Sequence, residues 1–130
     1  LYSKNEIKLG NVKSSRDFTY VSDTCNAFLD ILKLKNLFGS TLNVGSNNEY
    51  TIEDIVKKIL IKLNSKANIK KEEKRKRPSN SEVVRLVCDN SKILKQTNWK
   101  PKINIEEGLV KTINWFKENK DLFKHDIYHV

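Results

Sequence analysis

The apolar residues of this chain recur with two periods, which predict short strands and amphipathic helices in an α/β fold. Residues 6–9 and 17–21 alternate or run apolar like strands, with a turn-rich loop between them. The clearest helix begins at Thr51, whose hydroxyl can cap the first turn in a capping box with Asp54. One face of this helix is expected to be core, and it carries Ile52, Ile55, Val56, Ile59, Leu60 and Leu63.

An earlier helix is predicted to begin at Asp23, a residue suited to the N-cap position. Residues 41–44 then form a predicted strand that stops at Gly45. Helical spacing predicts that the earlier helix buries Cys25, Phe28, Leu29 and Leu32.

The second half of the chain adds two strands, over residues 68–72 and 82–88, and two helices. Asp89 is expected to cap a short helix that ends at a left-handed Asn98. Asn104 caps the last helix, and the fold class is therefore α/β, a small mixed sheet with about four helices. The buried face of the last helix is expected to consist of Ile105, Leu109, Ile113 and Phe116.

Length and composition fit one domain over residues 1–130 that can bury a core. No apolar run approaches the roughly 20 residues of a membrane helix, and no secretory leader is visible, so we expect a soluble, cytoplasmic protein. Cys25 and Cys88 lack CxxC spacing and are expected to be small buried hydrophobes rather than a disulfide or a metal site. His125 and His129 are four residues apart without a third ligand nearby, so no metal site is predicted.

The formal net charge of +9 raises nucleic acid as a partner. The excess is nearly all lysine, however, and it is spread along the chain. The densest basic run, residues 70–77, is interrupted by two glutamates. A small basic nucleic-acid-binding domain is therefore kept only as the alternative function, with a protein-interaction module as a third; the preferred interpretation includes no nucleic acid and no membrane.

The chain begins with Leu1 and contains no methionine. From this we expect it to be the C-terminal piece of a longer polypeptide.

Two of the four arginines stand in settings suited to an anionic ligand. Arg77 precedes a proline, which fixes the backbone, and Glu82 follows five residues later. Arg16 begins a second polar-to-apolar run. Arginine presents a planar fork of donors to phosphate oxygens, while a carboxylate can accept bonds from a sugar diol. The competing interpretation is that Arg77 merely ends the basic run.

An ordered series of motifs resembles the C-terminal part of the NAD-dependent nucleotide-sugar epimerase/dehydratase family, the extended short-chain dehydrogenases. The form Arg-Pro-x-x-Ser-Glu-Val and the ending at residues 123–128 further resemble 4,6-dehydratases of nucleotide-linked N-acetylglucosamine, of the legionaminic-acid type. The series, nearly the whole chain long, consists of Arg16-Asp17-Phe18-Thr19-Tyr20-Val21-Ser22-Asp23, Leu42-Asn43-Val44-Gly45-Ser46, Thr51-Ile52-Glu53-Asp54-Ile55, Arg77-Pro78 with Glu82, Asp89-Asn90-Ser91-Lys92, Asn98-Trp99-Lys100-Pro101 and Glu106-Glu107-Gly108-Leu109 through Trp115-Phe116.

The resemblance implies a substrate-binding subdomain. Arg16 and Arg77 would contact the diphosphate of a UDP-, GDP- or dTDP-linked sugar, and Glu82 a ribose hydroxyl. Leu9 and Ile52 would flank the base.

The chain has no glycine-rich phosphate loop and no Tyr-x-x-x-Lys pair. The resemblance therefore implies that NAD and the catalytic groups belong to a Rossmann half absent here. By itself the chain is expected to bind no cofactor and to be inactive. The family's usual homodimer surface also lies in that half, so we expect a monomer or weak self-association.

Overall fold

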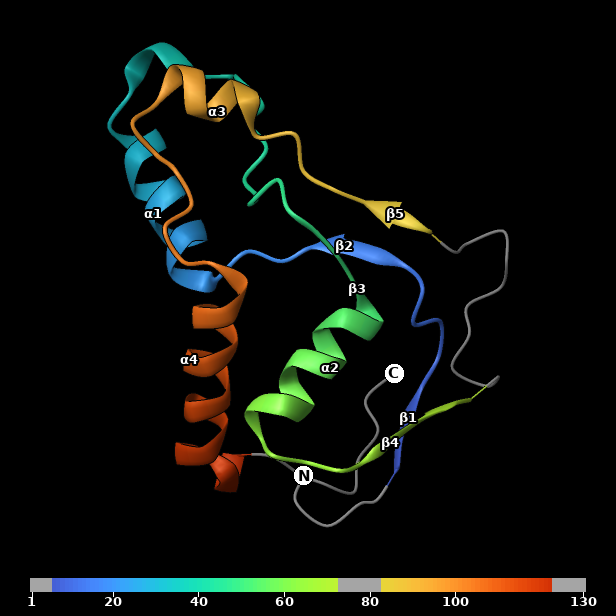
Figure 1. Ribbon diagram of the computed structural model, residues 1–130. Coiled ribbons are helices and arrows are strands. Elements are labelled where there is room, and N and C mark those ends of the chain that lie inside the picture. Colours follow the sequence, from blue (N-terminus) through green and yellow to red (C-terminus); the bar gives the residue numbers. More distant parts are fainter. Residues whose placement is uncertain (1–5, 73–82, 123–130) are drawn as a thin grey trace.

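Figure 1 shows the computed structural model, which describes residues 6–72 and 83–122. Four α-helices and five short strands form in these ranges, with 3-10 turns at Lys35–Leu37 and Lys120–Leu122. The α/β prediction and the expected number of helices are confirmed. In chain order the elements are β1 (Glu6–Leu9), β2 (Ser15–Asp17), α1 (Val21–Leu32), β3 (Glu49–Thr51), α2 (Ile52–Lys62), β4 (Asn68–Lys71), β5 (Arg85–Leu86), α3 (Ser91–Gln96) and α4 (Ile105–Glu118).

The strands form two small sheets instead of the single mixed sheet that the sequence predicted. β1 pairs in parallel with β4. In the second sheet β2 lies between β3, to which it is antiparallel, and β5, to which it is parallel. Arg16 on β2 is therefore in register with Tyr50 on one side and Leu86 on the other. The second sheet therefore joins three segments that are distant in sequence.

The α2 helix forms as its capping signals predict. The Thr51 Oγ1 accepts a hydrogen bond from the Asp54 backbone N–H at 3.1 Å, and the Thr51 N–H donates to the Asp54 carboxylate at 3.2 Å. This reciprocal capping box satisfies two backbone donors that a helix start leaves open. Ile55 is buried and the rest of the predicted stripe is half-buried. Asn64, directly after this helix, is left-handed (φ 49°), as is Asn47 (φ 58°), whereas the predicted Asn98 does not have a positive φ.

The α1 helix differs from its prediction at both its start and its buried face. It begins at Val21, because the Tyr20 carbonyl already accepts bonds from the N–H groups of Asp23 and Thr24. Asp23 is not the N-cap. The face that packs on the core carries Ala27, whereas Cys25 is exposed. The predicted core residues Phe28, Leu29 and Leu32 are 61%, 56% and 76% exposed.

The core lies between α1, α3 and the link that precedes α4. Ala27, Ile93 and Trp99 are buried together, and Ile31, Leu42 and Val44 pack against them. Asp23 is only 2% exposed, and its carboxylate accepts the backbone N–H groups of Lys102 and Ile103, both at 2.9 Å. Its carbonyl accepts the Trp99 indole N–H at 2.8 Å. A single aspartate thus fastens the link to α1.

Four other strand and helix predictions need correction. Residues 41–44 form no strand, because no neighbouring strand pairs with them in the described ranges. Within the described part of the strand predicted over 82–88, residues 83–88, the strand is limited to Arg85–Leu86, and β2 ends at Asp17 instead of continuing to residue 21. Asn90 occupies the N-cap of α3, although the Asp89 carboxylate accepts the Ser91 N–H at 2.9 Å.

The α4 helix begins at the predicted cap, where the Asn104 Oδ1 accepts the Glu107 N–H at 3.0 Å. Ile105, Leu109 and Ile113 are half-buried, but Phe116 is 37% exposed. The buried face of α4 therefore ends about one turn before the last residue predicted for it. Gly108 is buried because the Tyr20 ring lies over it.

Glu106 joins α4 to α2 through two lysines. Its carboxylate oxygens lie 2.5 Å from the Nζ atoms of Lys58 and Lys62. Hydrogen bonds from these two lysines lower the pKa of Glu106 from its ordinary value of 4.5 to about 2. A carboxyl group with a lowered pKa in the folded state stabilises the protein above its ordinary pKa.

We predict that the Glu106→Gln variant lacks the pH-dependent stability that the paired Glu106 carboxylate provides. The free energy of unfolding of the wild type should decrease relative to that of the variant as the pH falls from 4.5 to about 2, below which the two should be equal. Urea denaturation across this pH range measures the difference. Glu118→Gln, on the same helix and without an ion pair to the described residues, is the control. Parallel curves for the wild type and Glu106→Gln would contradict the prediction.

Candidate functional site

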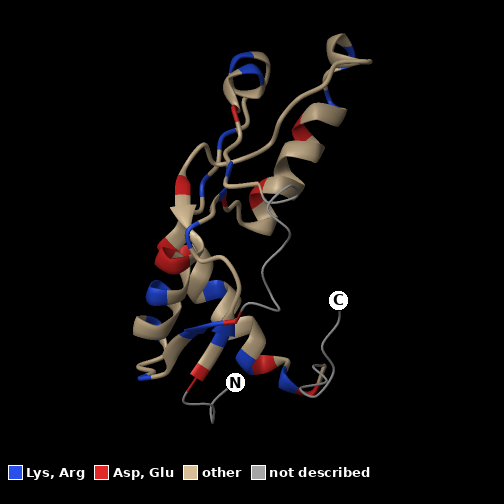
Figure 2. Cartoon of the chain, turned by 90° about the vertical axis from the view of Figure 1, so that its right-hand side faces the viewer, with Lys and Arg blue, Asp and Glu red and all other residues tan. Residues whose placement is uncertain are grey.

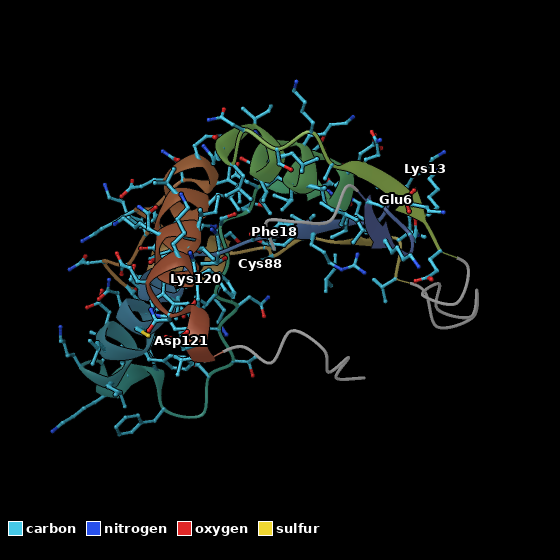
Figure 3. The ribbon with its side chains drawn as sticks, turned by 90° about the horizontal axis from the view of Figure 1, so that it is seen from below. Glu6, Lys13, Phe18, Cys88, Lys120 and Asp121 are labelled. Atoms are coloured by element: carbon cyan, nitrogen blue, oxygen red, sulfur yellow. The ribbon has the colours of Figure 1, made fainter. Side chains whose placement is uncertain are left out.

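An open hollow of the described surface lies where the second sheet meets the core. Its volume is about 480 Å³ and it is open to solvent. Its walls come from Arg16, Asp17 and Thr19 on and after β2, from residues 42–45, and from residues 86–89 at and after the end of β5. In Figure 3, Cys88 from this wall lies in the middle of the molecule, between the helical end and the end that carries Glu6.

Asp17 holds the three walls together. One carboxylate oxygen accepts the backbone N–H of Ser46 at 3.0 Å and its hydroxyl at 2.5 Å. The other accepts the backbone N–H groups of Asn47 at 2.8 Å and Cys88 at 3.3 Å. Because bonds between an ionised acceptor and backbone N–H groups are strong, this carboxylate fixes the hollow while its charge is already engaged.

Gly45 and Asn90 complete the frame of the hollow. The buried Asn90 side chain donates to the Gly45 carbonyl at 2.8 Å. An added Cβ at Gly45 would lie 2.2 Å from the Cβ of Cys88 and 2.6 Å from its sulfur. Only glycine therefore allows the 42–45 segment to approach the 86–89 segment this closely.

Arg16 is the one cationic side chain that lines the hollow among the described residues. Its Nη1 donates to the carbonyl of its neighbour Ser15 at 2.6 Å, and its other guanidinium donors make no hydrogen bond to the described residues. The lining also includes the carboxylates of Asp17 and Asp89, which are engaged by backbone N–H groups. The described lining alone thus carries more negative than positive charge.

The other predicted site residues are not brought to this hollow. Leu9 lies on β1 in register with Lys71, and Ile52 begins α2; both are half-buried and neither lines the hollow. Arg77 and Glu82 lie outside the described residues. The described part of the chain resumes at Val83, and three residues, 83–85, separate Glu82 in the sequence from Leu86 of the hollow wall.

Arg85 is engaged elsewhere. Its Nε donates to the Glu49 carboxylate at 2.9 Å, and the Ser15 hydroxyl donates to the same carboxylate at 2.5 Å. These two bonds, that of Ser15 first, lower the pKa of Glu49. The trio ties β5 and β3 to the central strand β2 and keeps Arg85 away from the hollow lining.

Neither cysteine forms a nucleophilic site with the described residues. Burial, with a smaller contribution from Asp17 and Asp89, raises the pKa of the Cys88 thiol, so the reactive thiolate is disfavoured. Both cysteines are free, and the expectation that Cys25 is buried is wrong. In residues 6–72 and 83–122 no group of three or more His, Cys, Asp or Glu residues could hold a metal ion.

Basic and acidic residues are interleaved on the face shown in Figure 2, and no continuous lysine stripe appears there. Several lysines are paired with carboxylates, including those of Glu53, Glu106 and Glu107. The alternative of a nucleic-acid-binding domain has no support in this arrangement. Within the described ranges no helix is long and apolar enough to cross a membrane.

The fold is that of NAD-dependent nucleotide-sugar epimerases and dehydratases. The dTDP-glucose 4,6-dehydratase of Bacillus anthracis, solved in complex with NAD, superposes with a TM-score of 0.77 at 26% identity. That match covers 92% of this chain and 36% of the dehydratase. The UDP-glucuronic acid 4-epimerase of Bacillus cereus, solved with UDP-glucuronic acid and NAD, shares the fold with a TM-score of 0.76 at 24% identity. That match covers 87% of this chain and 35% of the epimerase chain.

A family model described as GDP-mannose 4,6 dehydratase matches residues 1–112, and the chain belongs to this family. The UDP-glucuronate 4-epimerase of Thermodesulfobacterium geofontis is 38% identical over 128 residues, which are 95% of this chain and 37% of that protein. The human dTDP-D-glucose 4,6-dehydratase is 34% identical over 116 residues, 85% of this chain and 32% of its own length. The chain thus spans about a third of the curated relatives that it matches.

The residues that the structure describes do not form a dinucleotide cradle for the family's NAD. Gly45 is packed against Cys88 and Gly108 lies under Tyr20, inside a helix. Gly39 stands alone at a positive φ of 75°. A dinucleotide site needs several glycines together at a helix start, and no step of NAD chemistry is therefore assigned to this chain.

Sequence reasoning missed the structural role of Asp17 and Asn90. Both were part of quoted motifs, but their partners lie 29 to 71 residues away in the sequence. No spacing rule reports such contacts. The only local signal for these roles was that each motif contains a short polar side chain.

Proposed function

We propose that residues 1–130 form a subdomain that binds the nucleotide-diphosphate part of a nucleotide-sugar, for a 4,6-dehydratase or epimerase that uses NAD. Arg16 is the phosphate contact of the hollow, and Arg77 is the second. Glu82 accepts bonds from a ribose hydroxyl, and Leu9 with Ile52 flanks the base. The observation that carries the proposal is the placement of Arg16 in an open hollow of about 480 Å³ in a chain of this family.

The charge of the hollow argues for a second arginine. Its described lining holds one cation and two carboxylates, so a diphosphate needs a further positive group to bind. Arg77 lies in the stretch that leads into β5, the strand beside Arg16. Two guanidinium groups could each bind one phosphate in bidentate fashion, an arrangement that the point charge of lysine does not reproduce.

The finer assignment concerns the sugar. The sequence of residues 77–83 supports a 4,6-dehydratase of nucleotide-linked N-acetylglucosamine. We therefore expect UDP-N-acetylglucosamine to bind more tightly than UDP-glucuronic acid. The chain itself should show no NAD-dependent turnover. Turnover by the purified chain would contradict the proposal that it only binds the substrate.

Calorimetry tests the proposed diphosphate contacts. We predict that Arg16→Ala and Arg77→Ala each weaken the binding of UDP-, GDP- or dTDP-sugars by roughly 10- to 100-fold, as expected for one charged hydrogen-bonding group. Arg85→Ala is the matched control, because this arginine is bound to Glu49 and does not line the hollow. Unchanged affinity in either variant would exclude that arginine as a phosphate contact.

A further inference from the structure

A second cavity lies beyond the end of β2 and shares no lining residue with the hollow. Its volume is about 150 Å³, and it is less open to solvent than the hollow. Three segments that are distant in sequence surround it: the end of β2, the turn that leads into β3, and the link that leads into α4. The described lining consists of Phe18, Ser46, Asn48, Tyr50 and residues 101–105. None of these residues belongs to the proposed nucleotide site.

The apolar part of the cavity is suited to a single ring. Phe18 and Tyr50 contribute half-buried aromatic side chains, and Pro101, Ile103 and Ile105 contribute half-buried aliphatic ones. Aromatic side chains attract another ring through offset or edge-to-face contacts, in addition to the burial of its surface. Sites for drug-sized ligands have volumes of roughly 300–1,000 Å³, so a cavity of about 150 Å³ is too small for a nucleotide.

The polar part of the lining is positively charged. Lys102 is exposed, and its amine has no carboxylate partner within the described ranges. The described lining includes no Asp or Glu. Glu106, which directly follows the lining, is already paired with Lys58 and Lys62. The cavity also lies at the start of α4, where the helix dipole favours negative charge. An anionic group therefore complements this lining.

Hydrogen bonds hold both sides of the cavity in place. On one side the buried Asp23 carboxylate accepts the backbone N–H groups of Lys102 and Ile103, both at 2.9 Å, so its own charge is engaged. On the other side the Asn48 N–H donates to the Ser46 hydroxyl at 3.2 Å, and the Asn48 side chain donates to the Ser46 carbonyl at 3.1 Å. A cavity with fixed walls needs little ordering when a ligand binds.

We infer that this second cavity binds a small aromatic carboxylate, with its ring against Phe18 and Tyr50 and its carboxylate beside the Lys102 amine. The ring matches the size and the aromatic walls of the cavity, and the carboxylate matches its unpaired cation. The inference goes beyond the proposed function, because it involves none of the proposed phosphate, ribose or base contacts. Its test accordingly contains no nucleotide.

Amide NMR of the 130-residue chain titrated with benzoate tests the site. We expect saturable shifts at residues 46–50 and 102–105, with roughly millimolar affinity for so small a ligand. Benzyl alcohol, which has the ring but no charge, should bind more weakly. Lys102→Gln should weaken benzoate binding roughly two- to fivefold, as expected for an exposed ion pair, and leave benzyl alcohol binding unchanged. Lys100→Gln is the matched control, since this exposed lysine of the same link does not line the cavity.

Tyr50→Leu tests the ring contact separately. It should weaken the binding of both probes by roughly two- to tenfold, because it removes one aromatic wall. Lys102→Gln alters only an exposed side chain, so it decides the question even if Tyr50→Leu is unstable.

Four results would overturn the inference. The first is the absence of saturable shifts with benzoate. The second is a set of benzoate shifts confined to the walls of the hollow, which would place the anion at Arg16 instead. The third is equal affinity of the wild type for benzoate and benzyl alcohol. The fourth is an equal effect of Lys102→Gln and Lys100→Gln on benzoate binding.

Discussion

Gly45→Ala is expected to reduce the free energy of unfolding by about 3 kcal/mol, the upper end of what overpacking costs. The new Cβ would lie 2.2 Å from the Cβ of Cys88 and 2.8 Å from the Asp17 Oδ2. Neither atom can move cheaply, because Cys88 is part of the hollow wall and the Asp17 carboxylate is held by several N–H donors. Urea denaturation of the variant measures the loss.

Gly39→Ala is the control for this prediction. Nothing lies within 4 Å of an added Cβ there, but the φ of 75° strains any other residue. Its cost should be only about 1 kcal/mol. Equal losses at Gly45 and Gly39 would show that close packing against Cys88 does not limit position 45. The double variant Gly45→Ala/Cys88→Gly should recover part of the loss, since both cysteine atoms in the overlap are removed.

Asp23→Ala is expected to cost a similar amount, about 3 kcal/mol, because it leaves buried donors without partners. The variant removes the acceptor of the Lys102 and Ile103 N–H groups. The link that carries Trp99 into the core would then be held to α1 mainly by the indole bond to the Asp23 carbonyl. Thermal or urea denaturation gives the size of the effect.

Asp30→Ala tests whether removing any aspartate from α1 reduces the free energy of unfolding by as much. Within the described residues, the Asp30 side chain forms only the ion pair with Lys33, at 3.3 Å and near the end of the helix. Exposed pairs of this kind contribute little, so its substitution should be close to neutral. If Asp23→Ala is equally neutral, the 102–103 link does not depend on the buried carboxylate, and the account of the core is wrong.

Local signals of the sequence predicted local structure well. The caps at Thr51 and Asn104 act within three residues, and both helices begin where these caps indicate. The sheet register and the hollow could not be predicted in this way, because they depend on Asp17 reaching Ser46 and Cys88. Such contacts are set by tertiary packing alone.

The α1 helix shows why the predicted core was partly wrong. Its sequence has two apolar faces, one with the small Ala27 and one with the larger Phe28 and Leu32. Burial of large side chains is worth more, so the sequence favoured the second face as core. In the structure Ile93 and Trp99 approach the first face, where alanine allows close packing. The larger face is left exposed in the described part of the chain.

The central claim is that the hollow around Arg16 binds a nucleotide diphosphate. Amide NMR of the 130-residue chain titrated with UDP tests it most directly. The account predicts saturable shifts at residues 16–19, 42–45 and 86–89, the walls of the hollow. It also predicts weaker shifts with UMP, which lacks the second phosphate. Shifts confined to the lysines of α2 and β4, or equal shifts with UMP and UDP, would contradict the claim.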